Sequence, residues 1–155
     1  VTISAEKEHQ NSPVSNLRNY NDNRFYNNCG PKPNSESDTI IKFDFGTNKR
    51  IDLHSYLIRT GADGQNYDHQ KTWRIEGSND GQSWTKLDRR SDNSVLNDKY
   101  KECHFICQFG HHGSENNLFR YIRYVQEDSW HSDGSRKYVV DLTYFELYGN
   151  VVTIL

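Results

Sequence analysis

Three residue types are scarce in this chain: its 155 residues include three cysteines, three prolines and no methionine. Long apolar runs are missing as well, because only 33% of the residues are hydrophobic and they gather in short blocks. A membrane-spanning helix needs about 20 consecutive apolar residues, so the sequence excludes one. Since methionine is absent even from position 1, we expect the sequence to be a piece of a longer or processed protein.

An excess of either charge is also missing. The chain has 19 Lys and Arg against 21 Asp and Glu, a net charge of −2, and both signs are interspersed. Without a cluster of Lys and Arg, no surface is expected to attract nucleic acid, and no polybasic segment is expected to hold an anionic membrane. We therefore expect no nucleic-acid partner, and we rank membrane binding below the binding of protein or carbohydrate.

The three cysteines do not form an evident disulfide pattern. Cys103 and Cys107 lie four residues apart in a predicted strand, about 13 Å along it, whereas a disulfide needs Cα atoms within about 7 Å. Cys29 is able to pair with either of them, and this choice stays open. The odd count and the lack of any Asn-x-Ser/Thr acceptor favour a reducing compartment. We expect an intracellular, cytoplasmic location, with a secreted or cell-surface one as the alternative.

Aromatic residues, by contrast, make up 13% of the chain, and several recur with a period of two. Trp73, Ile75 and Gly77 alternate with polar residues, which is the pattern of a half-buried strand. Asn-Asp-Gly at 79–81 tolerates positive φ, so the chain is able to turn there into a second strand that carries Trp84. The segment therefore predicts a β-hairpin whose tryptophans serve the core or the hairpin itself.

Further short strands, separated by turns rich in Gly, Asn and Asp, are predicted at 41–45, 51–59, 100–109, 119–125 and 138–148. Many short strands without any sustained 3.6-residue period predict an all-β antiparallel sandwich. Residues 1–150 form the single predicted domain, and 151–155 are a C-terminal tail or the start of a linker.

Five segments of the chain resemble the discoidin domain family, also known as the coagulation factor V/VIII type C or galactose-binding-like family. They follow the family's order along the chain: Val1–Ala5, Ile41–Gly46, Trp73–Trp84, Phe119–Arg123 and Phe145–Gly149. The resemblance implies an eight-stranded antiparallel jelly roll. It also implies a ligand-binding module that is part of a larger multidomain protein.

Two features differ from the secreted members of that family. Secreted members join the first and last strands by a disulfide, and no cysteine lies near Val1 or Gly149. The long loop 88–99 and the segment 61–73 resemble intracellular members, in which the domain accompanies BTB, kelch or ubiquitin-ligase modules. The resemblance therefore implies an intracellular-type member.

The loops of an antiparallel sandwich alternate between its two ends. By this count the loops 6–36, 61–71, 88–99 and 127–137 share one end, where the resemblance also implies the ligand site. Loops on a rigid scaffold are where binding residues gather. The candidate ligand-binding residues in these loops are Arg24, Tyr26, Asp63, Asn66, His69, Arg90, Trp130 and His131.

Two kinds of ligand suit these residues. A protein partner needs an aromatic anchor with Arg or Asp beside it, whereas a sugar needs a flat ring for its C–H face and hydrogen-bonding groups for its hydroxyls. We rank a protein partner first and a galactoside-type carbohydrate second, with Trp130 as the stacking platform for a sugar. A purely structural spacer is the third hypothesis. The sequence leaves the oligomeric state open.

Motifs for catalysis and metal binding are missing. No Gly-x-Ser-x-Gly elbow, phosphate-binding Gly loop or His-Glu-x-x-His occurs, so we expect a module without enzymatic activity. His111 and His112 are adjacent and their side chains diverge, and with no third ligand nearby in sequence we interpret them as an exposed turn. Asn21 and Asp22 are weak candidates for a structural calcium ion, and we expect no other cofactor.

Overall fold

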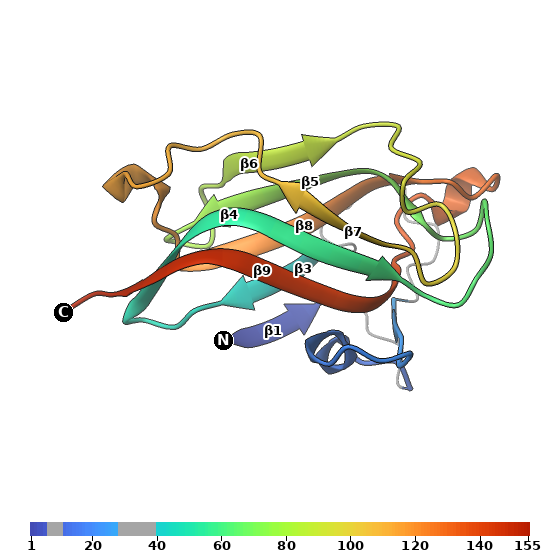
Figure 1. Cartoon of the computed structure of the whole chain (residues 1–155), viewed down its shortest axis with the longest axis horizontal. Coiled ribbons are helices and arrows are strands. Elements are labelled where there is room, and N and C mark those ends of the chain that lie inside the picture. The colour runs from blue at the N-terminus through green and yellow to red at the C-terminus, as the bar shows by residue number, and fades with distance from the viewer. Residues whose placement is uncertain (6–10, 28–39) are drawn as a thin grey trace.

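The computed structural model describes residues 1–5, 11–27 and 40–155, which fold as a sandwich of two antiparallel sheets (Figure 1). One sheet has the strand order β1-β3-β8-β5-β6 and the other has the order β2-β9-β4-β7. The strands are β1 (Thr2–Ala5), β2 (Phe25–Tyr26), β3 (Ile40–Asp44), β4 (Lys49–Thr60), β5 (Gln70–Ser78), β6 (Thr85–Arg90), β7 (Glu102–Ile106), β8 (Tyr121–Ser129) and β9 (Asp141–Thr153). Short 3-10 helices lie between them: η1 (Val14–Arg18), η3 (Glu115–Asn117) and η4 (Gly134–Arg136).

The all-β jelly-roll sandwich predicted from the sequence is confirmed. Within the described residues, eight strands have four residues or more, and β2 has two. The predicted strand 100–109 is shorter in the structure: β7 spans Glu102–Ile106, and Tyr100, which has positive φ, lies before it. β9 continues to Thr153, past the boundary predicted at 150, and pairs with β4 as far as Lys49.

The core lies between the two sheets and is rich in aromatic rings. Trp73 on β5 is fully buried, as its alternation predicted, and its ring centroid lies 5.2 Å from that of Phe105. Tyr56 on β4 stacks on Phe105 and Phe145, with centroids 5.3 and 6.1 Å apart. Its hydroxyl accepts a 2.9 Å hydrogen bond from Trp73 Nε1 and donates a 2.5 Å hydrogen bond to Asp88. Buried polar groups paired in this way hold the two sheets in one relative position.

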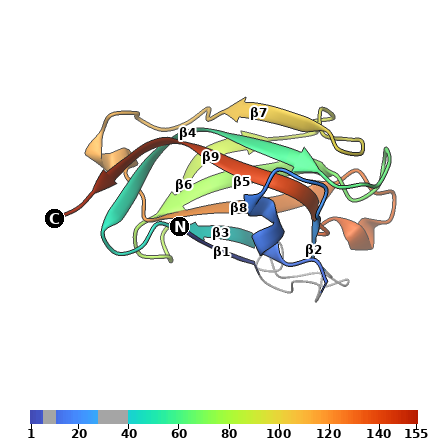
Figure 2. The same cartoon turned by 60° about the horizontal axis from the view of Figure 1, so that its bottom comes forward.

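One end of the sandwich, here named the pocket end, carries the connection after β4, the one after β6 and the one before β9 (Figure 2). It consists of 11–24, 61–69, 91–101 and 130–140. The amide of Asn97 donates to Asn66 Oδ1 at 2.9 Å, and Trp130 Nε1 donates to the Asn93 carbonyl at 3.0 Å. These contacts confirm that 61–71, 88–99 and 127–137 meet, as strand alternation predicted. Of the predicted loop 6–36, residues 6–10 and 28–36 lie outside the described residues.

The opposite end, here named the far end, consists of 45–48, 79–84 and 107–120. Arg120 joins its three loops. The backbone N–H of Arg120 donates to Asn79 Oδ1 at 2.9 Å, and its carbonyl accepts from the N–H of Phe45 at 3.0 Å. Its guanidinium also donates to Asp44, at the end of β3, at 2.9 Å. The helix η3 lies at this end, well separated from η4 at the pocket end (Figure 1).

Cys103 and Cys107 both carry free thiols, so they do not pair with each other, as their spacing predicted. Burial raises the pKa of the Cys107 thiol to about 12, which keeps it uncharged at neutral pH. Cys29 lies outside the described residues. Within the described part of the chain, no helix is long and apolar enough to cross a membrane.

Candidate functional site

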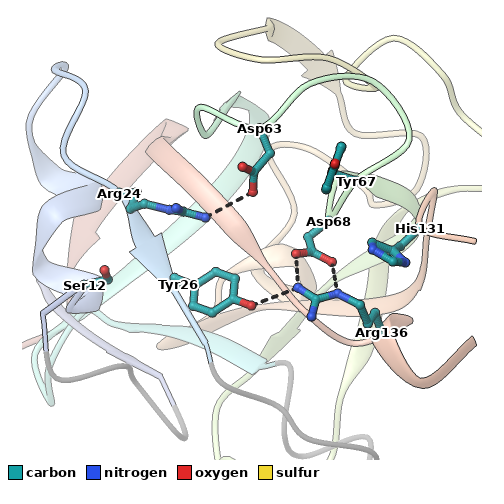
Figure 3. Close-up of a pocket in the computed structure, with 8 residues that line it drawn as sticks. All are labelled: Ser12, Arg24, Tyr26, Asp63, Tyr67, Asp68, His131 and Arg136. Carbon is teal, nitrogen blue, oxygen red and sulfur yellow. Dashed lines mark hydrogen bonds and ion pairs between the residues drawn. The ribbon is translucent and has the colours of Figure 1, made fainter. Parts of the chain in front are cut away.

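A cavity of about 490 Å³ opens at the pocket end. Its walls come from the segment before β2, the loop after β4 and the loop before β9 (Figure 3). The residues that line it are Ser12, Arg24, Tyr26, Asp63, Tyr67, Asp68, His131 and Arg136. The volume lies within the range of about 300–1,000 Å³ that small-molecule sites usually have.

Arg24 forms one wall and is held by two carboxylates. Its Nε donates to Asp141 Oδ1 at 2.9 Å, and its Nη2 lies 3.3 Å from Asp63 Oδ2. The guanidinium also lies over the ring of Tyr26, 5.0 Å from the centroid. These contacts fix Arg24 in one orientation, while 37% of its side chain stays exposed to solvent. A fixed, partly exposed guanidinium is well suited to donate hydrogen bonds to a ligand.

Asp141 lies beneath Arg24 and is completely buried. It fits there because residue 61 is glycine: a Cβ at Gly61 would lie 2.2 Å from Asp141 Oδ1. Burial raises the pKa of Asp141 to about 6, and the ion pair with Arg24 opposes this rise. Its Oδ2 is buried and makes no hydrogen bond among the described residues.

Arg136 forms the opposite wall. Its guanidinium makes a two-pronged ion pair with Asp68, through Nε to Oδ1 at 2.8 Å and through Nη2 to Oδ2. Nη2 also donates to the hydroxyl of Tyr26 at 2.9 Å. The hydrogen bonds with Asp68 raise the pKa of Arg136 further above its usual range. Tyr26 therefore connects the two walls, because its ring lies under Arg24 and its hydroxyl bonds to Arg136 (Figure 3).

Tyr67 supplies an exposed aromatic ring to the lining of the cavity. Just over half of the residue, 53%, is exposed to solvent. Its ring makes an edge contact with the ring of His131, with 5.9 Å between centroids. Figure 3 shows Tyr67 between Asp63 and His131. A flat ring bordered by donors and acceptors is the combination that sugar binding needs.

The structure brings together half of the residues that the sequence singled out. Arg24, Tyr26, Asp63 and His131 line the cavity. The other four candidates have their side chains engaged elsewhere: Asn66, His69, Arg90 and Trp130.

His69 is fully buried, and its Nε2 lies 2.8 Å from the Asp63 carbonyl and 2.9 Å from the Gly64 carbonyl. It therefore stabilises the conformation of the loop 61–69 through hydrogen bonds to its backbone. Asn66 has φ of 64° and bonds to Asn97, which braces the same loop. Both residues support the cavity wall without facing the cavity.

Arg90 and Trp130 lie further away. Arg90 Nε donates to Asp88 at 2.9 Å, and its guanidinium lies over the ring of Phe105. Trp130 donates to the Asn93 carbonyl, and the ammonium of Lys71 lies 4.9 Å from its ring centroid. The indole thus packs against the loop 91–101 and does not line the cavity.

Sequence reasoning did not single out Ser12, Tyr67, Asp68 or Arg136. All four lie in loops that were expected to form the ligand end, so their general location was predictable. Their individual roles depend on side-chain directions in loops, and loops have no periodicity from which direction is read.

The two calcium candidates, Asn21 and Asp22, bind the guanidinium group of Arg59. Arg59 Nη1 donates to the Asn21 carbonyl at 3.0 Å, and Nη2 donates to Asp22 Oδ1 at 2.9 Å. A calcium ion bound to the same oxygen atoms has to displace this guanidinium. Calcium binding there stays a prediction from the sequence.

His111 and His112 are exposed and His112 lies in a turn, as the sequence predicted, but the fold adds two candidate ligands that are distant in sequence. Asp52 and His54 on β4 lie beside His112, and the ligand atoms of these three residues are all within 4.8 Å of one another. They are separated from His112 by about 60 residues in sequence, so only the folded chain brings them together.

Comparison with known proteins gives fold neighbours only. No family model matches the sequence, and no curated protein matches it. CBM62 from Clostridium thermocellum Xyl5A is 16% identical, with a TM-score of 0.65 over 97% of this chain and 94% of that one. The family 32 CBM from C. perfringens NanJ, in complex with galactose, is 17% identical, with a TM-score of 0.59 over 94% and 91% of the two chains.

Two further matches agree with these. CBM32 of AlyQ, in complex with 4,5-unsaturated mannuronic acid, is 16% identical, with a TM-score of 0.61 over 96% of this chain and 94% of that one. The family 89 glycoside hydrolase from Clostridium perfringens is 14% identical with a TM-score of 0.61, and this chain spans only 14% of its length. None of these similarities supports the intracellular type expected from the sequence. The fold of the chain is the galactose-binding-like jelly roll that it shares with carbohydrate-binding modules.

Proposed function

We propose that this chain is a non-catalytic carbohydrate-binding module that binds a sugar in the cavity at the pocket end. The observation that carries the proposal is the exposed ring of Tyr67 beside two fixed arginine–carboxylate pairs, Arg24–Asp63 and Arg136–Asp68. The C–H face of a sugar packs on the ring, while its hydroxyls accept from the arginines and donate to the carboxylates.

The charge of the cavity favours a neutral sugar. Among the described lining residues, each arginine is already paired with a carboxylate, so the two positive charges are balanced by Asp63 and Asp68. An anionic sugar has to compete with these carboxylates for the guanidinium groups. A neutral hexose or disaccharide bonds to both members of each pair without displacing either.

The cavity suits a sugar better than a protein partner, which the sequence ranked first. A stable protein interface buries about 800 Å² on each side around an apolar centre. The cavity instead is small and mostly lined by charged and hydroxyl-bearing side chains. Two of the fold neighbours are sugar complexes, one with galactose and one with 4,5-unsaturated mannuronic acid, which supports this choice. A carbohydrate ligand also favours the secreted or cell-surface alternative for localisation.

We expect no hydrolysis of the bound sugar. Glycoside hydrolysis needs a protonated carboxyl and a second carboxylate, both in contact with the glycosidic bond. Asp141 has a pKa raised by burial to about 6, as a general acid requires, but it lies fully buried beneath Arg24. A sugar in the cavity therefore does not reach its carboxyl group.

The proposal is tested first on a glycan array and then by calorimetry with the sugars that bind. We expect saturable binding that Tyr67→Ala weakens at least about tenfold, or about 1.4 kcal/mol. Phe109→Ala is the matched control, because Phe109 is a similarly exposed aromatic at the far end, 48% exposed. An array without saturable binding, or equal affinity in the Tyr67 variant, contradicts the proposal. In that event, proximity labelling with the parent protein becomes the search for a protein partner.

A further inference from the structure

A second cluster of ligating side chains lies at the far end, away from the cavity. Asp52 and His54 come from β4, and His112 comes from the loop 107–120. His112 Nδ1 lies 2.9 Å from Asp52 Oδ1, and His54 Nε2 lies 3.3 Å from Asp52 Oδ2. The two imidazole rings are 4.5 Å apart between centroids. This group is named the His–Asp–His cluster.

A β-bulge contributes to the cluster. Leu53 pairs with Gly149 and Ser55 pairs with Tyr148, so His54 is the extra residue in β4. Bulges re-aim a side chain and are common beside functional sites. The His54 carbonyl accepts a 2.9 Å hydrogen bond from the N–H of Cys107. Cys107 is the first residue of the loop 107–120, which carries His112.

The carboxylate of Asp52 is held in place before any ligand arrives. The N–H of Gly113 donates to Oδ2 at 2.8 Å, and the side-chain amide of Asn117 donates to Oδ1 at 2.5 Å. Asp52 and Asn117 are both buried. Hydrogen bonds of this kind orient the carboxylates that bind metals in proteins and keep them from rotating away.

The Nε2 atom of His54 contacts Asp52 but makes no hydrogen bond of normal geometry among the described residues. This nitrogen is buried from solvent, and its approach to Asp52 at 3.3 Å is not aligned as a hydrogen bond. Metal–ligand bonds of 2.0–2.1 Å in a tetrahedron place neighbouring ligand atoms about 3.3 Å apart. The separation between His54 Nε2 and Asp52 Oδ2 therefore matches two ligands of one metal ion. His112 contacts the other oxygen, Oδ1, so one ion reaches all three residues through both carboxylate oxygens or after a small shift of an imidazole.

We propose that Asp52, His54 and His112 bind a divalent transition-metal ion, and that Zn²⁺ fits best. Two imidazole nitrogens and one carboxylate oxygen are a usual zinc donor set, with a fourth position left for water. His112 is on the exposed side of the cluster, which leaves that position open to solvent. Calcium and magnesium prefer all-oxygen ligands and suit the cluster poorly. The ion ties β4 to the loop 107–120.

The test uses the chain without a histidine tag, with Zn²⁺ alone as the probe. Competition with a chromophoric chelator measures affinity and stoichiometry, and the visible spectrum of added Co²⁺ reports whether coordination is tetrahedral. We expect one ion per chain and a higher unfolding temperature in the presence of Zn²⁺. His112→Ala should lower the affinity by about tenfold or more.

His111→Ala is the matched control, because His111 is the adjacent exposed imidazole and lies outside the cluster. It should bind Zn²⁺ like the unaltered chain. His54→Gln is a second variant that should lose affinity, in case His112→Ala does not fold as judged by circular dichroism. Absence of stoichiometric Zn²⁺ binding overturns the proposal, as does equal affinity in the His111 and His112 variants. Either result means that the cluster is only a hydrogen-bonded brace.

Discussion

The indole nitrogen of Trp130 donates a hydrogen bond of 3.0 Å to the backbone carbonyl of Asn93, which joins two loops of the pocket end. Trp130→Ala should therefore leave carbohydrate affinity unchanged and lower the free energy of unfolding by about 1–2 kcal/mol, from the lost bond and packing. Calorimetry and urea denaturation measure the two effects. A loss of sugar binding with unchanged stability would mean that the indole is a stacking platform after all.

Stability should depend on pH through Asp141. Its pKa rises from 3.8 to about 6 in the folded chain, so the folded state keeps a proton that the unfolded state loses in this interval. The contribution of Asp141 to the free energy of unfolding therefore falls as pH rises through this interval, by up to about 3 kcal/mol. Asp141→Asn should remove that contribution, so the variant gains stability relative to the unaltered chain between about pH 4 and 6.5. Parallel stability curves for the two proteins would contradict this assignment.

Gly61 should tolerate no side chain. A Cβ at this position would lie 2.2 Å from the Asp141 carboxylate, so Gly61→Ala has to push Asp141 away from Arg24. We expect lower stability and weaker sugar binding, measured by thermal unfolding and calorimetry. Gly64→Ala is the control in the same loop, because a Cβ there meets no atom within 4 Å. If both variants behave alike, the close contact between Gly61 and Asp141 does not govern the cavity.

The hydroxyl of Tyr56 should contribute to stability without any role in binding. It accepts from Trp73 and donates to Asp88 in the core, so Tyr56→Phe leaves both partners short of a hydrogen bond. The expected cost is about 1–3 kcal/mol, measured by urea denaturation. Tyr20→Phe serves for comparison: its hydroxyl bonds to Glu102 at the surface, and its removal should change stability by less than about 0.5 kcal/mol. Equal effects of the two variants would show that burial of this hydroxyl does not matter.

The fold could be predicted from the sequence because its signal is local and periodic. Trp73 and Ile75 alternate with polar residues, and both are fully buried in the structure. Asn-Asp-Gly at 79–81 lies in the predicted turn, with positive φ at Gly81, but the loop continues to Trp84, so Trp84 lies just outside β6. Strand ends were harder to place, since they depend on pairing: β9 reaches Thr153 because β4 continues beside it.

The sites could be predicted only in part. Alternation of the strands placed Arg24 and Asp63 at one end, and the two side chains do meet there. Whether a loop residue faces the cavity depends on packing that no local pattern records, which is why Tyr67 was passed over and His69 was selected. The sequence drew attention to His112 through its neighbour His111, but it gave no signal for Asp52 and His54, because these partners lie on a distant strand.

The strand β9 leads the chain from the cavity to the opposite end of the domain. The strand begins at Asp141, beside the cavity, and runs the length of the sandwich to Thr153, which pairs with Lys49. A fluorescent reporter or a solid support attached after Leu155 therefore stands at the end away from the cavity (Figure 1). Insoluble polysaccharides should then reach the cavity without steric hindrance from the reporter or the support.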